Sequence, residues 1–209
     1  MSKTRQIAFV PAFAVAFCFA GVLQLQAADT PAAPPNAREL TEKVIRDVLA
    51  VLRDPKNSVA DRRDKVQQIA YDNLNFDVMA RLSLGQYYRG LTDAQKSQYA
   101  DAFKQHVTNT YRHTTDHYTD EDIKVTGDRK EAKEDWTVMT QIIDNKGSQV
   151  VKVDYRLRLK DGAWKVIDLT IDGVSLVSNF RSQFQAIMNN GGIEKLLQLL
   201  REKNAANDK

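Results

Sequence analysis

The chain has 209 residues, of which 43% are hydrophobic and 27% are charged, and this composition excludes a chain that is disordered throughout. It is ordinary for one globular domain that is large enough to bury a core. The 30 Lys and Arg residues nearly balance the 27 Asp and Glu residues, which argues against nucleic acid binding, because that function requires clustered basic charge.

The first residues have the pattern of a secretory signal peptide. Lys3 and Arg5 precede an uncharged apolar run at 7–25, and small residues follow at 27–28. This order predicts export and cleavage. A retained membrane anchor is the alternative, but Pro11 interrupts the run and a polar linker follows it at once.

Removal of the predicted signal peptide, residues 1–28, would leave a chain without any thiol. The single cysteine, Cys18, lies within it. An exported protein without disulfides is consistent with the bacterial periplasm, where a core must hold the domain together unaided. Residues 29–39 are rich in proline and alanine and are predicted to be a flexible leader.

Apolar residues at helical spacing dominate the first half of the remaining chain. Thr41 is the predicted N-cap of a first helix, which stops before Pro55. Ser58 is the predicted N-cap of a second helix, with Asp61 favourably placed in its first turn. The residues that this second helix is expected to bury are Val66, Ile69, Ala70 and Leu74.

Two more helices are predicted before the first strand. A short apolar one covers residues 76–83, and a loop with Gly85 and Gly90 follows it. Thr92 and Gln95 have the spacing of a capping box, which predicts a long helix from there to about residue 117. Its apolar face comprises Tyr99, Ala102, Phe103, Val107, Thr110 and Tyr111.

After residue 118 the apolar period changes to two, which indicates strands. In the clearest of them, apolar residues alternate with charged ones from 151 to 159, so one face is expected to be buried and the other solvated. Hairpin turns are predicted at 145–147 and 160–162. The predicted strands are 122–126, 135–144, 149–160 and 164–171.

Two helices are predicted to follow the strands. The first covers residues 174–188, and the second, which carries Ile193, Leu196, Leu197 and Leu200, begins after a turn at 189–192. Residues 204–209 are expected to be a disordered tail. Together these elements predict one α+β domain over residues 40–203, with an antiparallel sheet of about four strands packed against several helices.

Ser175 is the candidate nucleophile that the sequence offers, because it lies between a predicted strand and a predicted helix. The preceding Gly173 fits a nucleophile elbow, but the second glycine of that motif is replaced by Val177. Ser175 is therefore better explained as the N-cap of the following helix.

The remaining polar candidates are also weak. His113 and His117 have a spacing that zinc sites use, but the glutamate base of the metalloprotease motif is missing, so a solvated surface is favoured. Paired carboxylates, such as Asp168 with Asp172, lack a recognisable partner for acid and base roles. Arg181 is predicted to pair with a carboxylate such as Asp172; the alternative is that it donates to a ligand phosphate.

Three segments of the chain resemble a known family. They are LSLGQYYRGLTDAQKSQYADAFKQHVTNTY at 82–111, YRLRLKDGAWKVIDLTIDGVSLVSNFRSQF at 155–184 and GGIEKLLQLL at 191–200. The likeness extends over residues 40–200, and its most specific part is the stretch from Trp164 to Phe184. The family that these segments resemble is MlaC, also called the toluene-tolerance family. Its members are periplasmic phospholipid carriers of the Mla ABC transport system, which maintains the lipid asymmetry of the outer membrane in Gram-negative bacteria.

The resemblance implies a deep apolar cavity between the sheet and the helices, which holds acyl chains and leaves the head group at its mouth. It implies no catalytic residue, no metal and no cofactor, because the phospholipid is cargo. The implied partners are the inner-membrane Mla ABC transporter complex and the outer-membrane Mla lipoprotein-porin complex. The carrier is expected to be a monomer.

The residues expected to contact the lipid come from the solvent-excluded strand face and from the apolar helix faces. In the last strand the residues on both faces are apolar, so the sequence does not decide which face meets the cavity. The predicted lipid-binding residues are Phe76, Met79, Phe103, Val107, Tyr111, Val138, Thr140, Ile142, Val151, Val153, Tyr155, Leu157, Val166, Leu169, Val177, Phe180 and Phe184.

Two functions from other classes remain as alternatives. A small α+β enzyme for a hydrophobic substrate would use Asp168 or His113 as its base. A structural or adaptor protein would have its interior filled by side chains.

Overall fold

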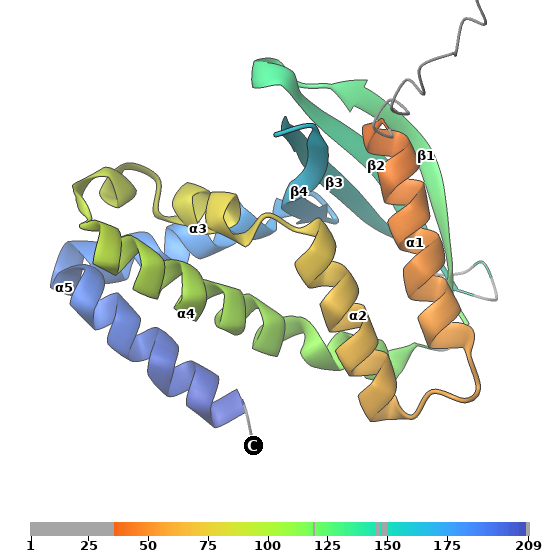
Figure 1. The fold of residues 1–209 in the computed structure, drawn as a ribbon, viewed down its shortest axis with the longest axis horizontal. Coiled ribbons are helices and arrows are strands. Elements are labelled where there is room, and N and C mark those ends of the chain that lie inside the picture. The colour runs from red at the N-terminus through yellow and green to blue at the C-terminus, as the bar shows by residue number, and fades with distance from the viewer. Residues whose placement is uncertain (1–35, 119, 145–146, 148–149, 208–209) are drawn as a thin grey trace, which may run out of the picture. The chain divides into compact units, whose positions relative to one another are not determined.

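The computed structural model describes residues 36–118, 120–144, 147 and 150–207 (Figure 1). The predicted signal peptide and the leader up to residue 35 lie outside these residues, as does most of the predicted turn at 145–147. None of the helices in the described part of the chain is long and apolar enough to cross a membrane.

Helix α1, Ala37–Arg53, begins five residues earlier than the sequence predicted. Its N-cap is Asn36, whose side chain accepts a hydrogen bond from the amide of Glu39 at 2.8 Å, while the Glu39 carboxylate accepts one from the Asn36 amide at 3.0 Å. Thr41, the predicted cap, lies within the helix and donates to the Ala37 carbonyl instead. The last three residues of the predicted leader are therefore helical.

The other predicted helix starts in the first half are confirmed. Ser58 and Thr92 are N-caps with complete capping boxes, formed with Asp61 and Gln95. The long predicted helix becomes a 3-10 helix after Tyr111. The elements are α2 (Val59–Asn73), α3 (Phe76–Leu84), η1 (Gly85–Gly90), α4 (Asp93–Tyr111) and η2 (Arg112–His117).

The sheet is antiparallel, as predicted, and its strands follow chain order; about four strands were expected, and the described residues form five. The additional strand is a pair of residues at the sheet edge, next to β4. The first strand also extends four residues beyond its predicted end. The strands are β1 (Asp122–Lys130), β2 (Asp135–Ile143), β3 (Val150–Lys160), β4 (Ala163–Ile171) and β5 (Val174–Ser175), and the 3-10 turn η3 (Ala132–Glu134) joins β1 to β2.

A β-bulge in β4 settles which of its residues share the buried face of β3. The pairing passes from Arg156 with Asp168 to Leu157 with Val166, so Ile167 has no partner of its own. Tyr155 pairs with Leu169, and Leu157 pairs with Val166. Because of the extra residue, Val166 and Leu169 lie on one face although their spacing is odd.

Helix α5, Leu176–Asn207, covers both of the predicted C-terminal helices except for residues 174–175, which form β5 instead. They meet at Gly192, which has φ 63° and ψ −165°, a conformation that is essentially limited to glycine. The second half continues through most of the tail that was expected to be disordered. It is fixed there by Asn204, which is buried and donates to the Ala102 carbonyl of α4 at 3.0 Å.

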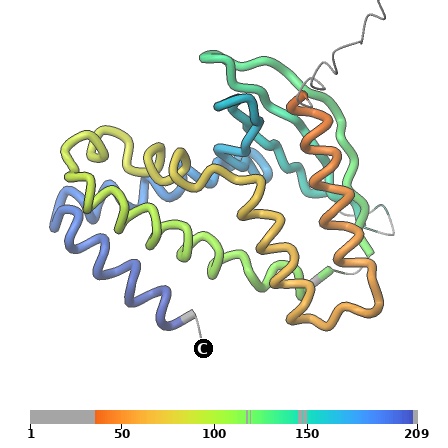
Figure 2. The backbone as a smooth tube through the Cα atoms, in the orientation of Figure 1, coloured from red at the N-terminus to blue at the C-terminus, as the bar shows by residue number. Residues whose placement is uncertain are grey.

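The described part of the chain has two hydrophobic cores, and the helices around the larger one lie beside one another in the backbone trace (Figure 2). The larger one lies among α3, α4 and α5 and includes the packed rings of Tyr99, Phe103, Phe180 and Phe184. The smaller one lies between α1 and the sheet and is formed by Ala37, Val138, Leu157 and Val166. Leu74 and Leu169 pack against both cores, so they mark the place where the two cores meet.

Candidate functional site

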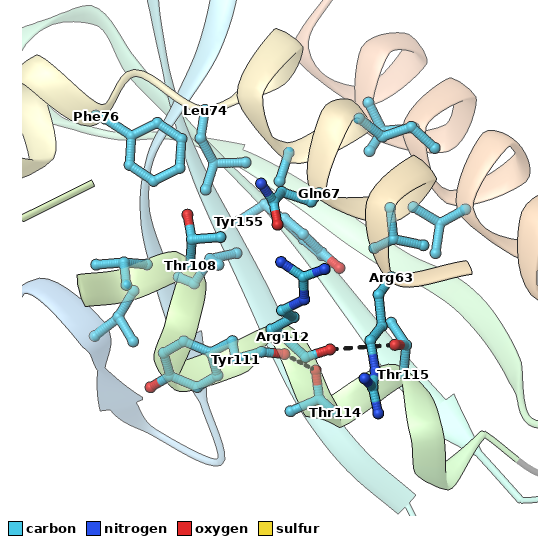
Figure 3. Close-up of a pocket in the computed structure, with 18 of the residues that line it drawn as sticks. Arg63, Gln67, Leu74, Phe76, Thr108, Tyr111, Arg112, Thr114, Thr115 and Tyr155 are labelled. Carbon is cyan, nitrogen blue, oxygen red and sulfur yellow. Dashed lines mark hydrogen bonds between the residues drawn. The ribbon is translucent and has the colours of Figure 1, made fainter. Parts of the chain in front are cut away.

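A cavity of about 340 Å³ lies where the two cores meet (Figure 3). This volume falls at the lower end of the range of small-molecule sites, about 300–1,000 Å³. Among the described residues on its wall, most side chains are apolar and none is a carboxylate, a histidine, a serine or a cysteine. The lining residues are Val44, Val48, Arg63, Val66, Gln67, Ile69, Ala70, Leu74, Phe76, Val107, Thr108, Tyr111, Arg112, Thr114, Thr115, Tyr155, Leu169, Ile171 and Leu176.

Helices α1 and α2 form one wall of the cavity. Helix α1 has two apolar stripes: Ile45 and Leu49 are buried, whereas Val44 and Val48 face the cavity and remain partly exposed. Helix α2 has no fully buried residue at all. Its predicted core stripe of Val66, Ile69, Ala70 and Leu74 lines the cavity instead.

The opposite wall comes from the sheet and the helical core. Strands β3 and β4 supply Tyr155, Leu169 and Ile171, and α4 supplies Val107 and Tyr111. Burial raises the pKa of the Tyr155 phenol to about 12, against the smaller opposing effect of a hydrogen bond with Thr140. Burial also raises the pKa of Tyr111. Both phenols are therefore neutral at physiological pH, and this wall carries no charge.

Arg63, Arg112, Thr114 and Thr115 gather at one end of the cavity, away from Leu74 and Phe76 (Figure 3). We call this end, with these four residues, the polar rim. Gln67 lies closer to Leu74 in the same view. The buried carbonyl oxygen of the Gln67 side chain has no hydrogen-bond partner in the described part of the chain, while its amide donates to the Tyr71 hydroxyl.

Two ion pairs join α2 to η2 at the polar rim. Arg63 forms a fork with Asp116, with Nε to Oδ1 at 2.7 Å and Nη2 to Oδ2 at 2.5 Å. Arg112 donates to Asp64 at 2.7 Å. The hydrogen bonds from Arg63 lower the pKa of Asp116 to about 2, and His113 contributes in the same direction. Asp116 is therefore ionised at neutral pH, and the fork is fully charged.

The polar candidates from the sequence have structural partners. Ser175 accepts a hydrogen bond from the Ser178 amide at 3.0 Å, which supports the N-cap interpretation, and its hydroxyl donates to Asp168 at 2.6 Å. Arg181 donates to the Leu82 carbonyl, so the prediction that it pairs with Asp172 was wrong. Asp172 accepts from the Lys152 amide instead. No cluster of metal-ligating side chains occurs among the residues in the described ranges.

The structure separates the predicted lipid-binding residues into two groups. Five of them line the cavity: Phe76, Val107, Tyr111, Tyr155 and Leu169. The others are not part of its wall. Of these, Met79, Phe103, Val177, Phe180 and Phe184 belong to the larger core, Val138, Leu157 and Val166 belong to the smaller core, Thr140 and Val153 are buried in the sheet, and Ile142 and Val151 are paired with each other and partly buried.

Sequence reasoning missed the contribution of α1 and α2 to the wall, and it missed the polar rim. The stripe on α2 was visible in the sequence, but a stripe that faces a cavity has the same spacing as one that packs in a core. The rim depends on the approach of η2 to α2, between residues about 50 positions apart. No local pattern reports that approach.

The comparisons with known proteins agree with this geometry. A family model described as MlaC protein matches residues 42–202. The intermembrane phospholipid transport system binding protein MlaC of Haemophilus influenzae is 20% identical over 168 residues, which cover 79% of this chain and 78% of that protein. The phospholipid-binding protein from Ralstonia solanacearum, solved in complex with a phospholipid, matches with a TM-score of 0.73 and 26% identity, over 84% of this chain and 100% of that one.

Proposed function

The chain belongs to the MlaC family, and from this premise we propose that it is a periplasmic phospholipid carrier. The observation that carries the proposal is the apolar cavity at the junction of the two cores, where the described wall residues include no carboxylate and no histidine. The phospholipid bound in the solved Ralstonia structure supports the choice of ligand.

The proposed ligand explains why a cavity of this kind is needed. Two acyl chains of about fifteen methylenes each, at roughly 0.8 kcal/mol per methylene, cost on the order of 24 kcal/mol when they are exposed to water. Free diffusion of a phospholipid through an aqueous compartment is therefore negligible. A protein that encloses the chains removes this cost.

The distribution of polar groups gives the proposed orientation of the lipid. Acyl chains would lie against the α2 stripe and against Tyr155 and Leu169 of the sheet. The head group would lie at the polar rim, where it stays hydrated. Because the rim supplies two paired arginines rather than a closed pocket, we expect head-group selection to be loose.

The rest of the proposal concerns the setting. We place the mature chain in the periplasm after removal of its signal peptide, as a monomer that shuttles phospholipid between the outer and inner membranes and so maintains outer-membrane lipid asymmetry. Its proposed partners are an inner-membrane Mla ABC transporter complex and an outer-membrane Mla lipoprotein-porin complex. It would catalyse no reaction and bind no cofactor other than its cargo.

Organic extraction of the protein purified from cells, followed by mass spectrometry, tests the proposal. We expect glycerophospholipids with mixed head groups in near-stoichiometric amount. Protein that carries no lipid, or a different class of hydrophobic molecule, would contradict the carrier function. A single exclusive head group would contradict only the loose selection.

A further inference from the structure

A second recess, distinct from the lipid cavity, is lined by five cationic side chains and, among the residues that the structure describes, by no acidic one. Its volume is about 790 Å³, and none of its residues lines the cavity described above. We call it the cationic recess; it is lined by Arg81, Leu82, Gly85, Tyr88, Arg89, Lys133, Arg158 and Arg181. The five cations come from five different elements, α3, η1, η3, β3 and α5.

Two of the five cations are held in place by the fold. Arg158 donates through Nε and Nη2 to the two oxygens of Asp135, at 2.6 and 2.8 Å, and Asp135 is completely buried. Arg181 donates twice to the Leu82 carbonyl, at 2.9 and 2.5 Å. Gly85, with φ 56°, lies close enough that an added Cβ would be 3.6 Å from Arg181 Nε. These two side chains have therefore already lost much of their conformational freedom.

The other three cations, Arg81, Arg89 and Lys133, are exposed. No carboxylate in the described part of the chain lies within ion-pair distance of any of them. Lys133 is presented by a tight turn in which it has φ 61° and which is closed by a hydrogen bond from the Glu131 amide to the Asp135 carbonyl at 2.8 Å. Unpaired like charges around one recess repel one another, so a multivalent anion would stabilise them.

We infer that the cationic recess is a docking site for an acidic segment of a protein partner. The recess has more than twice the volume of the lipid cavity, and its charges surround it, so carboxylates spaced along a chain match it better than one phosphate does. Because the cations line a recess, a flat bilayer surface would not reach all of them together. Leu82 and Tyr88 offer apolar contacts beside the charges.

This inference rests on the proposed carrier function, because a lipid carrier must bind its protein partner and dissociate from it quickly. Contacts between opposite charges accelerate association and are weakened by salt, which suits reversible docking. The lipid cavity and the cationic recess use different residues, so cargo and docking can be measured separately.

The test uses the purified mature chain and a fluorescein-labelled peptide of alternating glutamate and glycine, with a glutamine and glycine peptide as the neutral probe. The recess variant is Arg81→Gln/Arg89→Gln/Lys133→Gln. Its matched control, Arg46→Gln/Lys124→Gln/Arg201→Gln, removes the same net charge from exposed side chains outside the recess. Fluorescence anisotropy measures binding at low and at physiological salt.

We expect the wild-type chain to bind the acidic peptide and not the neutral one, with an affinity that falls as salt rises. The recess variant should weaken binding about tenfold or more, and the control variant less than about twofold. Equal weakening by both variants would show an effect of net charge alone and overturn the inference. Recess-dependent binding of inorganic phosphate or of phosphatidylglycerol vesicles, without binding of the peptide, would overturn it as well.

Two further measurements keep the result interpretable. All six substituted side chains are exposed, so both variants should have the thermal unfolding temperature of the wild type. If the recess variant unfolds at a lower temperature, its three single variants are measured instead. At least two of them must then weaken peptide binding. Lipid extraction is repeated on each variant. A recess variant that keeps its lipid but loses the peptide separates this inference from the carrier function.

Discussion

Two valines, Val66 and Val138, occupy sites at which the same substitution should have different effects. Val66 of α2 lines the cavity and is only partly buried. Val138 of β2 has no exposed surface and packs in the smaller core. A charge placed at the first site can be hydrated through an empty cavity, whereas at the second it is enclosed by apolar side chains.

We predict that Val66→Asp lowers the amount of co-purified lipid several-fold and leaves the thermal unfolding temperature, compared with that of the wild type after both have been stripped of lipid, nearly unchanged. The matched variant Val138→Asp should lose about 3 kcal/mol or more of unfolding free energy, because it buries an unpaired charge. Lipid extraction and thermal unfolding of both proteins measure the two effects. If Val66→Asp were as unstable as Val138→Asp, Val66 would be ordinary core.

The sequence predicted which side chains of a strand lie on its buried face, but it could not predict whether each of them packs in the core or lines the cavity. Val138 and Tyr155 pair across β2 and β3 on the predicted buried face. Val138 is enclosed in the smaller core together with Ala37 of α1, whereas Tyr155 lines the cavity. Alternation of apolar residues reports only that a face is excluded from solvent.

Features of the helices and strands that depend on nearby residues were predicted correctly, whereas features that depend on pairing between distant residues were not. Ser58 and Thr92 cap their helices because the partner groups are three residues away in the sequence. The bulge at Ile167 and the short strand β5 depend on pairing with distant or edge strands, and no pattern within them requires either. The reversal inside α5 was predicted as a turn at 189–192, and Gly192 provides it.

We predict that Gly192→Ala lowers the unfolding free energy by about 1–3 kcal/mol, because a Cβ is strained at its positive φ and extended ψ. Gly90→Ala is the matched control: its added Cβ meets no atom within 4 Å, and its φ is not in the positive region. We expect the control to change stability by less than about 0.5 kcal/mol. Urea unfolding of both variants tests this, and equal stabilities would show that the reversal does not depend on Gly192.

At the scale of the whole domain, α2 is attached at its two ends by contacts of different kinds. At its C-terminal end, Asn75 donates to the Val166 carbonyl of β4 at 2.8 Å, and Leu74 forms a bridge with the same residue. At the polar rim, the Arg63–Asp116 fork and the Arg112–Asp64 ion pair are both partly solvated. Partly solvated ion pairs contribute little stability each, so this end separates more readily.

We predict that Arg63→Gln/Arg112→Gln accelerates lipid transfer to acceptor vesicles several-fold, since it removes both ion pairs between α2 and η2. The control, Arg38→Gln/Arg129→Gln, removes two paired arginines elsewhere on the domain and should transfer lipid at the wild-type rate. The charge exchange Arg63→Asp/Asp116→Arg keeps an ion pair between α2 and η2, so this variant should release lipid more slowly than Arg63→Gln/Arg112→Gln. A fluorescent phospholipid transfer assay follows all four proteins, and an unchanged rate in the first variant would refute a role for the rim in release.

Helix α2 has an apolar stripe but not a single fully buried side chain of its own. If acyl chains occupy the adjoining cavity, the cargo supplies the packing partner that the polypeptide lacks there. Delivery of the lipid would then leave the carrier with a gap in its interior. Release of the lipid would loosen α2 first, and binding of another lipid would restore its packing. The free energy of unfolding would then be lower for the empty carrier than for the loaded one.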